Sequence, residues 1–152
     1  MIKIHITNLK NQPKISKRKL KEVATKVLVE LHKANREYEI NVILVDDAYI
    51  QKLNKKYRKV DLPTDVLVFP IGEIPTRGKG KLKFMGDIYI STDRVAQQVQ
   101  KDETLETEVQ RLLIHGLLHL VGYEHSEQMF YKQEYLLSQL SDKFSITKSN
   151  FQ

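Results

Sequence analysis

The chain has 152 residues, of which 41% are apolar and 29% charged, with six Gly, four Pro and no Cys. This composition excludes a collagen-like or largely disordered protein, and the lack of Cys excludes disulfides, thiol nucleophiles and Cys-based metal sites. The length favours one domain over residues 1–152. No apolar run approaches the ~20 residues of a membrane span, and the alternation of residues 2–6 indicates a strand, not a signal peptide. We therefore expect a cytoplasmic protein without a membrane segment.

The net charge of +6 is unevenly distributed along the chain. Residues 1–60 carry 15 basic and 6 acidic side chains, whereas residues 101–152 carry 5 basic and 8 acidic ones. Such an asymmetry is typical of a basic face that binds a polyanion, with acidic surface elsewhere. A lysine-rich surface exposed to solvent would give the same pattern, and charge alone does not separate the two interpretations.

The first half of the chain alternates between strand and helix signals. Helical spacing of apolar residues follows Ser16, a good N-cap residue, and Lys17, Arg18 and Lys19 occupy the first turn. Cations there oppose the helix dipole, which hints at contact with phosphate. The sequence predicts a strand at 2–7, a helix at 17–34, a strand at 39–45, a helix from Asp46 or Asp47 through Tyr57, and a strand at 66–69.

The second half begins with a segment rich in Gly and Lys, residues 72–86, which predicts an exposed, mobile basic loop. A helix capped by Thr104 follows later and is apolar nearly all round, which predicts a position in the middle of the domain. The remaining predictions are a strand at 87–90, a helix near 92–100, a last helix at 127–144 and a frayed end at 145–152. Together they describe an α+β fold, with a small mixed sheet of about four strands packed against about five helices.

Three of the five histidines fall within eleven residues, in the run HGLLHLVGYEH at 115–125. His115 and His119 are four apart on the predicted central helix, so their rings project side by side. Gly122 stands where a left-handed residue can end the helix, and His125 can then fold back as a third ligand. Three neutral imidazoles with an open fourth position are typical of a catalytic zinc site. The isolated His5 and His32 are interpreted as surface residues.

This spacing is that of the zinc proteases called metzincins, with one change. Those enzymes carry a general-base Glu directly after the first His, and this chain carries Gly116 there. A peptidase without its base would lose ~2–4 orders of magnitude in rate, so proteolysis is disfavoured. The sequence thus predicts a zincin-like helix that bears a metal but serves another reaction.

The histidine run resembles the HGxLHLxGYDH signature of the YbeY-type endoribonucleases, bacterial zinc proteins that mature ribosomal RNA. The resemblance extends to Leu53-Asn54-x2-Tyr57-Arg58, to Pro63-Thr64-Asp65-Val66-Leu67 before Phe69-Pro70, and to Gly86-Asp87-Ile88 with Ile90-Ser91. It covers roughly residues 40–140. The chain departs from the family pattern at Glu124, where Asp is usual, at Val68, where Ser is common, and in its basic loop at 77–83.

The resemblance implies a single-strand-specific, zinc-dependent endoribonuclease of ribosomal RNA, chiefly of the small subunit, with one zinc held by His115, His119 and His125. Zinc lowers the pKa of water toward ~7, so no carboxylate base is required. The resemblance also implies that Arg58 lines the cleft, where a guanidinium can bind phosphate through two parallel donors. Two alternatives stay open: a non-catalytic RNA or ribosome assembly factor with a structural metal, and a metal-dependent hydrolase of another ester or peptide.

Further residues are candidates for supporting roles. Asp87 and Glu124 can orient ligand imidazoles, although capping or ordinary surface roles would explain them equally well. The candidates for contact with RNA are basic residues from three segments, namely Lys17, Arg18, Lys19, Lys55, Lys56, Arg77 and Lys79. The sequence does not identify protein partners, and the cleavage site is likewise open.

Overall fold

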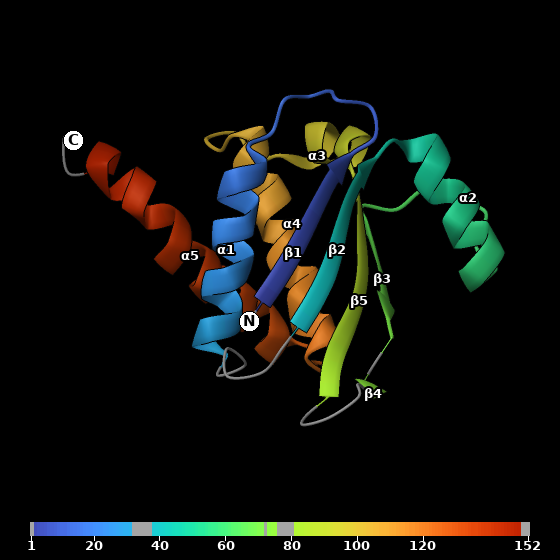
Figure 1. Cartoon of the computed structure of the whole chain (residues 1–152). Coiled ribbons are helices and arrows are strands. Elements are labelled where there is room, and N and C mark those ends of the chain that lie inside the picture. The colour runs from blue at the N-terminus through green and yellow to red at the C-terminus, as the bar shows by residue number, and fades with distance from the viewer. Residues whose placement is uncertain (1, 32–37, 72, 76–80, 150–152) are drawn as a thin grey trace.

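The structure, a computed structural model, describes residues 2–31, 38–71, 73–75 and 81–149. These residues form five strands and five helices (Figure 1). In chain order the elements are β1 (Ile2–Asn8), α1 (Lys17–Glu30), β2 (Tyr38–Val45), α2 (Asp47–Arg58), β3 (Val66–Pro70), β4 (Glu73–Pro75), β5 (Lys81–Ser91), α3 (Thr92–Gln98), α4 (Leu105–Leu120) and α5 (Glu127–Ser149).

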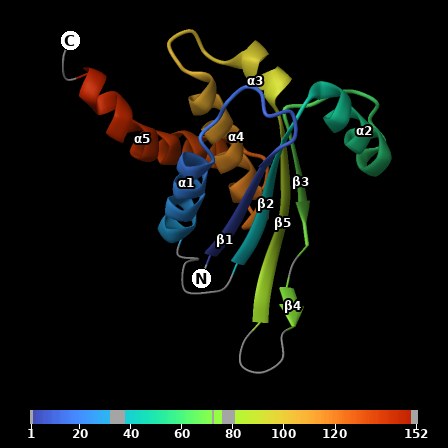
Figure 2. The same cartoon turned by 45° about the horizontal axis from the view of Figure 1, so that its top comes forward.

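The strands form one mixed sheet in the order β1-β2-β5-β3, and the short β4 pairs with β5 beyond β3. β1, β2 and β5 run parallel, whereas β3 and β4 run antiparallel to β5. Helices α1, α4 and α5 lie on one side of the sheet, and α2 lies at the other end of the molecule beside β3 (Figures 1 and 2). The α+β class with a small mixed sheet is confirmed.

The two faces of the sheet bury different clusters of apolar side chains, because neighbouring residues of a strand point to opposite faces. Ile40 and Ile88 belong to the main core with α1, α4 and α5. Tyr89, the next residue after Ile88, packs instead with Ile50 of α2 in a second cluster. The face that carries Ile88 is therefore the face that α4 covers.

The central position predicted for α4 is also confirmed. Thr104 caps the helix by accepting a hydrogen bond from the backbone N–H of Thr107 at 3.1 Å. The helix packs against α1, α3, α5, β3 and β5. Its apolar residues are buried around the whole circumference, namely Val109, Leu112, Leu113, Ile114, Leu117 and Leu118. An element enclosed in this way holds the side chains at its C-terminal end in fixed positions.

The prediction of an exposed loop at 72–86 is wrong for the described part of that segment. Residues 73–75 and 81–86 belong to β4 and β5, which pair antiparallel. Lys and Gly favoured the interpretation as a loop, but the alternation of Lys81 and Lys83 with Leu82 and Phe84 has the period of a strand. Residues 72 and 76–80, which include Arg77 and Lys79, lie outside the described residues.

Gly86 marks a β-bulge in β5. Phe84 pairs with Glu39, whereas Gly86 pairs with the next residue, Ile40, so one residue of β5 is unmatched. Gly86 has a φ of +137°, and a Cβ there would lie 2.2 Å from the carbonyl oxygen of Phe69. Only glycine allows β3 to pair so closely with β5, which sets the position of β3 at the site described below.

The helix boundaries differ from the predictions by a few residues. α1 ends at Glu30, where we predicted 34, and α3 ends at Gln98, where we predicted 100. α5 runs to Ser149, beyond the predicted end at 144 and into the segment that we expected to fray. Such differences are normal for helix ends, where propensity alone decides little.

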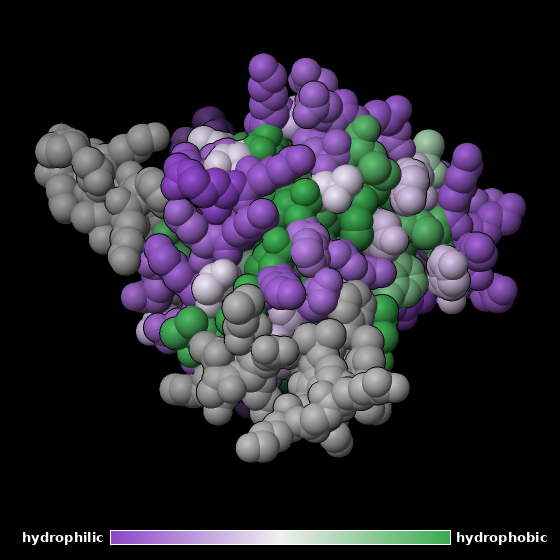
Figure 3. Space-filling view, viewed as in Figure 1, coloured by the Kyte–Doolittle hydropathy of each residue, from purple (hydrophilic) through white to green (hydrophobic). Residues whose placement is uncertain are grey.

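No helix in the described part of the chain is both long and apolar enough to span a membrane. Figure 3 shows that the side of the molecule seen in Figure 1 is mainly hydrophilic, with hydrophobic patches over the strands at its centre.

Candidate metal centre

Three histidines meet at the C-terminal end of α4. His115 and His119 lie on one face of the helix, and His125 lies in the segment between α4 and α5. One ring nitrogen of each histidine lies within 4.8 Å of the corresponding nitrogens of the other two. The Nε2 atoms of His115 and His119 are 3.2 Å apart. The structure therefore brings together the three residues that the sequence spacing selected.

The chain reverses after α4 through a glycine turn. Gly122 has a φ of +104°, its N–H donates to the carbonyl of His119, and the Tyr123 N–H donates to the carbonyl of Leu118, both at 3.0 Å. These two bonds are the pair that defines a Schellman motif. A Cβ at position 122 would meet nothing within 4 Å, so the glycine is needed for its backbone conformation and not for space. The turn directs His125 back toward α4.

Gln133 of α5 determines which nitrogen of His115 is available. Its Oε1 lies 2.7 Å from Nδ1 of His115, while its Nε2 donates to the carboxylate of Glu134 at 3.0 Å. A carboxylate can only accept, so the amide must turn its NH₂ group to Glu134 and its oxygen to His115. His115 must then carry its proton on Nδ1. Its Nε2 keeps a lone pair that points toward His119.

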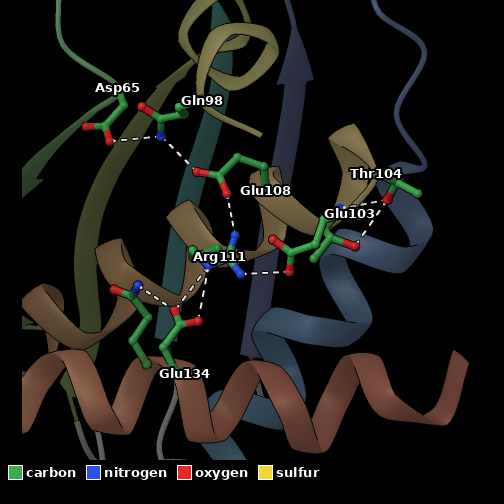
Figure 4. A network of polar contacts seen from close by, with 9 residues as sticks. Asp65, Gln98, Glu103, Thr104, Glu108, Arg111 and Glu134 are labelled. Atoms are coloured by element: carbon green, nitrogen blue, oxygen red, sulfur yellow. Dashed lines mark hydrogen bonds and ion pairs between the residues drawn. The ribbon is translucent and has the colours of Figure 1, made fainter. Parts of the chain in front are cut away.

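Glu134 is in turn held by Arg111, the centre of a buried ionic network (Figure 4). The guanidinium of Arg111 donates to Glu134 at 3.1 Å and to Glu103 at 2.8 Å, and it also pairs with Glu108. Burial lowers the pKa of Arg111, but the hydrogen bonds to Glu103, Glu108 and Glu134 outweigh burial and raise it. Arg111 is thus always charged, and it holds the carboxylate that orients Gln133.

The same network reaches β3 through Gln98 and Asp65. Nε2 of Gln98 donates to Glu108 at 2.8 Å and to Asp65 at 3.2 Å. Asp65 lies directly before β3, and its carbonyl accepts from the backbone N–H of Ser91 at 2.9 Å. Residues from α3, α4, α5 and the segment before β3 therefore share one set of hydrogen bonds (Figure 4). Four of them, Asp65, Gln98, Glu108 and Arg111, line a hollow together with His115 and His125.

The surroundings of His119 favour the neutral form that a metal requires. Burial is the main cause that lowers its pKa below the ordinary value of 6.5, and the neighbouring His115, His125 and Arg58 lower it further. A hydrogen bond with the backbone of Tyr123 opposes this shift. Because a neutral imidazole offers a lone pair and an imidazolium does not, the surroundings of His119 favour its use as a ligand.

The donor set fits a metal ion. His115, His119 and His125 can supply one ring nitrogen each, and His115 and His119 line a cleft that can admit a further ligand. Imidazole suits zinc and several other transition metals, and three protein ligands with one open position are typical of catalytic sites. Elsewhere in the described chain, His5 is exposed and bonds Glu39 at 3.0 Å, as expected for a surface histidine. His32 lies outside the described residues.

Arg58 lies at the C-terminal end of α2 and faces the histidines across a cleft. One of its Nη atoms donates to the carbonyl of Val68 in β3 at 2.6 Å, and its guanidinium lies 5.3 Å from the centroid of the Phe69 ring. Arg58, His115 and His119 line the same cleft, which has a volume of about 460 Å³. We call this hollow the Arg58 cleft. The structure thus brings Arg58 to the histidines, as the family pattern implied.

A second hollow adjoins the histidines from the side of α5, and we call it the α5 cavity. It has a volume of about 280 Å³, and His115 and His125 are in its wall. His115 therefore separates the two hollows. The other walls of the α5 cavity include Asp65, Gln98, Glu108, Ser126, Met129 and Phe130.

The two acidic residues proposed to orient the imidazoles lie elsewhere. Asp87 accepts a hydrogen bond from Asn41 at 2.9 Å. It precedes Ile88 in β5, so it points to the face of the sheet opposite α4. Glu124 is exposed, and no hydrogen bond to a histidine is found for it among the described residues. The structure assigns the contact with His115 to Gln133 instead.

The basic candidates are spread over the molecule. Lys55 and Lys56 are exposed on α2, the helix that carries Arg58. The basic residues at 17–19 lie at the start of α1, where Lys19 pairs with Glu106 at 3.7 Å. Glu106 and His119 are 13 residues apart on α4, about 20 Å along the helix at 1.5 Å per residue. The structure therefore places Lys55 and Lys56 on the helix that carries Arg58, where Lys55 lies 3.8 Å from Asp61, and it places residues 17–19 at the end of α4 far from His119.

Sequence analysis missed Gln133, Glu134 and Arg111. A signal for Gln133 does exist in the sequence, because it falls on the buried stripe of α5 between Met129 and Leu136. A polar residue at an apolar position of an amphipathic helix needs a partner, and here the partner is His115.

Comparisons with known proteins identify the family of the whole chain. The model of the family described as endoribonuclease YbeY matches residues 5–141. A relative from Aquifex aeolicus named endoribonuclease YbeY is 42% identical over 84% of this chain and 86% of its own length. Another so named, from Carboxydothermus hydrogenoformans, is 35% identical over 89% and 95%. The solution structure of a Thermotoga maritima protein is 32% identical, with a TM-score of 0.59, over 97% of this chain and 95% of that one.

Proposed function

Because this chain belongs to the YbeY endoribonuclease family, we propose that the histidine cluster is the catalytic centre of a zinc-dependent enzyme that hydrolyses phosphodiester bonds of RNA. The observation that carries the proposal is the convergence of His115, His119 and His125 in the wall of a cleft that also contains Arg58. A metal that serves only the fold would not need a cationic side chain across an open cleft.

Zinc is the metal that we propose, held by one nitrogen from each of the three histidines. When bound, it supplies a Lewis acid that makes water a nucleophile near neutral pH. The chain itself prepares the ligands: Gln133 keeps the Nε2 lone pair of His115 free, and burial lowers the pKa of His119, which favours its neutral form. Position 116, where zinc proteases carry a base, is a glycine.

Arg58 binds the phosphate in this proposal. Its contact with the Val68 carbonyl uses one N–H of a guanidinium that has five, so the remaining donors are available to phosphate oxygens. The Val68 carbonyl and the Phe69 ring already hold the guanidinium in place, so Arg58 loses less conformational freedom when it binds a phosphate. Arg58 thereby stabilises the charge that develops on the phosphate oxygens during hydrolysis.

The substrate is ribosomal RNA in the cytoplasm, chiefly that of the small subunit, and it is cut in single-stranded segments. The family assignment supports the role in processing of ribosomal RNA. The shape of the site supports the preference for single strands, because the Arg58 cleft and the α5 cavity are two separate small hollows of about 460 and 280 Å³. Unpaired nucleotides can enter such hollows, whereas the stacked bases of a duplex cannot.

The decisive experiment is the turnover of a defined single-stranded RNA by the wild type beside His119→Ala, purified identically. We expect about one zinc per chain and metal-dependent cleavage by the wild type, and loss of both zinc and cleavage in the variant, since two ligands hold zinc poorly. An assembly factor with a structural metal would bind RNA and cleave none. Equal cleavage by both proteins would indicate a contaminating nuclease.

A further inference from the structure

The two hollows beside the histidines differ in charge. The Arg58 cleft contains a cation, whereas the α5 cavity contains the carboxylates of Asp65 and Glu108. The one cation in the wall of the α5 cavity, Arg111, is already bonded to three carboxylates. A phosphate therefore binds favourably in the Arg58 cleft and is repelled from the α5 cavity.

The α5 cavity nevertheless has features of a binding site. Phe130 lines it with 57% of its surface exposed, although the adjacent Met129 is almost fully buried. Asp65 still has lone pairs to offer, because its Oδ2 accepts from Gln98 at 3.2 Å and its Oδ1 only meets Thr64 at 3.5 Å. An aromatic ring and a hydrogen-bond acceptor thus lie in one small hollow.

We propose that the α5 cavity binds an unpaired nucleobase next to the phosphate that is cleaved, with the base stacked on Phe130. This inference rests on the proposed endoribonuclease function. A nucleobase is a flat, uncharged group whose faces stack on aromatic rings and whose N–H groups donate at its edge. It suits a hollow that contains Phe130 and Asp65. Because His115 lies in both hollows, an RNA strand that places a phosphate at Arg58 can place the neighbouring base in the cavity.

The proposal is tested first by kinetics and binding of a defined single-stranded RNA. Stacking of one base is worth ~1–3 kcal/mol, so Phe130→Ala should raise the Kd by about 5- to 150-fold. Phe130→Tyr should restore most of the affinity, because it keeps the ring. The matched control is Tyr135→Ala, since Tyr135 is another exposed aromatic residue of α5, 53% exposed, and lies outside the cavity wall. Equal effects of the two alanine substitutions would overturn the proposal.

The second test uses the absence of Trp from the chain. Phe130→Trp creates a single tryptophan at the cavity, whose fluorescence a stacked base should quench when zinc-loaded protein and RNA are mixed rapidly. An RNA with an abasic nucleotide at one position near the cleavage site should fail to quench, and Tyr135→Trp, outside the cavity wall, should respond to neither RNA. Quenching by the abasic RNA at every position would contradict stacking. If the wild type cleaves RNA and Phe130→Ala binds RNA equally well, the proposed base-binding role of the α5 cavity fails and the proposed function stands. If the wild type cleaves no RNA, the proposed function itself fails.

Discussion

Replacing Gln133 with Leu tests whether a residue outside the histidine run controls metal binding. Gln133 is 6% exposed and accepts from Nδ1 of His115 at 2.7 Å. Leu has a similar volume but cannot accept a hydrogen bond, so the substitution removes the acceptor with little change in packing. His115 is then free to move its proton to Nε2, the nitrogen that must stay unprotonated to bind a metal.

The size of the expected effects follows from the two residues that lose a hydrogen bond with Gln133, namely His115 and Glu134. Loss of the group that orients a ligand histidine lowers metal affinity by roughly 10–100-fold. The free energy of unfolding of the metal-free protein should also fall by about 1–3 kcal/mol, because Nδ1–H of His115 and the carboxylate of Glu134 both lose a partner. We expect Gln128→Leu, the same change at an exposed position of α5, to alter neither quantity.

The assay is zinc affinity measured by competition with a chelator, together with the ¹⁵N chemical shifts of His115 in the metal-free protein. The shifts report the tautomer, which a loss of stability alone would not change. An unchanged zinc affinity in Gln133→Leu, with the Nδ1–H tautomer retained, would refute the claim that Gln133 positions His115.

The remaining predictions concern catalysis, RNA binding and pH. Arg58→Ala should lower kcat by about 100-fold or more with zinc content unchanged, and Arg58→Lys should recover only part of the rate; a change in KM alone would show ground-state binding. Replacing Lys55 and Lys56 with Gln should lower RNA affinity and reduce the slope of log K against log salt by about 0.7 for each phosphate that the protein no longer neutralises, whereas the same change at 17–19 should not. Because the pKa of His119 is lowered in the folded protein, the unfolded chain binds more protons below its ordinary value of 6.5. The contribution of neutral His119 to the free energy of unfolding of the metal-free protein should therefore be fully present above pH 6.5 and be lost as the pH falls from 6.5 toward the folded pKa. Urea titrations of the wild type and of His119→Asn should differ over that range.

The histidine cluster that could hold a metal could be predicted because its geometry is local. A helical repeat of four residues places His115 and His119 together, and a glycine turn is required to return His125. The residues that orient them could not be found in this way. Gln133 comes from another helix, and its partner Glu134 is held by Arg111, which is itself fixed by carboxylates from three places in the chain. Such contacts depend on how the helices pack.

The sheet shows the same division between local and tertiary information. β1, whose apolar residues alternate, and β2, which is rich in Ile and Val, were predicted from their residues. The lysine-rich residues 81–86 form a strand because their backbone pairs with β2 on one side and with β4 on the other. The predicted position of Asp87 beside the histidines was wrong for a related reason. The register of β5 decides the face of the sheet to which each side chain points, and Ile88, not Asp87, points to α4.

Packing also explains the residue that separates this site from that of a zinc protease. A Cβ at Gly116 would lie 2.9 Å from Cγ2 of Ile88 and 3.0 Å from its Cδ1, and Ile88 is fully buried in β5. A glutamate at position 116 would have to displace the core of the sheet, so α4 cannot carry a general base there while it lies this close to β5. The close contact between α4, which carries His115 and His119, and β5 thus excludes the general-base glutamate that zinc proteases carry at this position. The groups that act on the substrate must come from other elements, and among the described residues Arg58 of α2 is the cation that faces the histidines across the cleft.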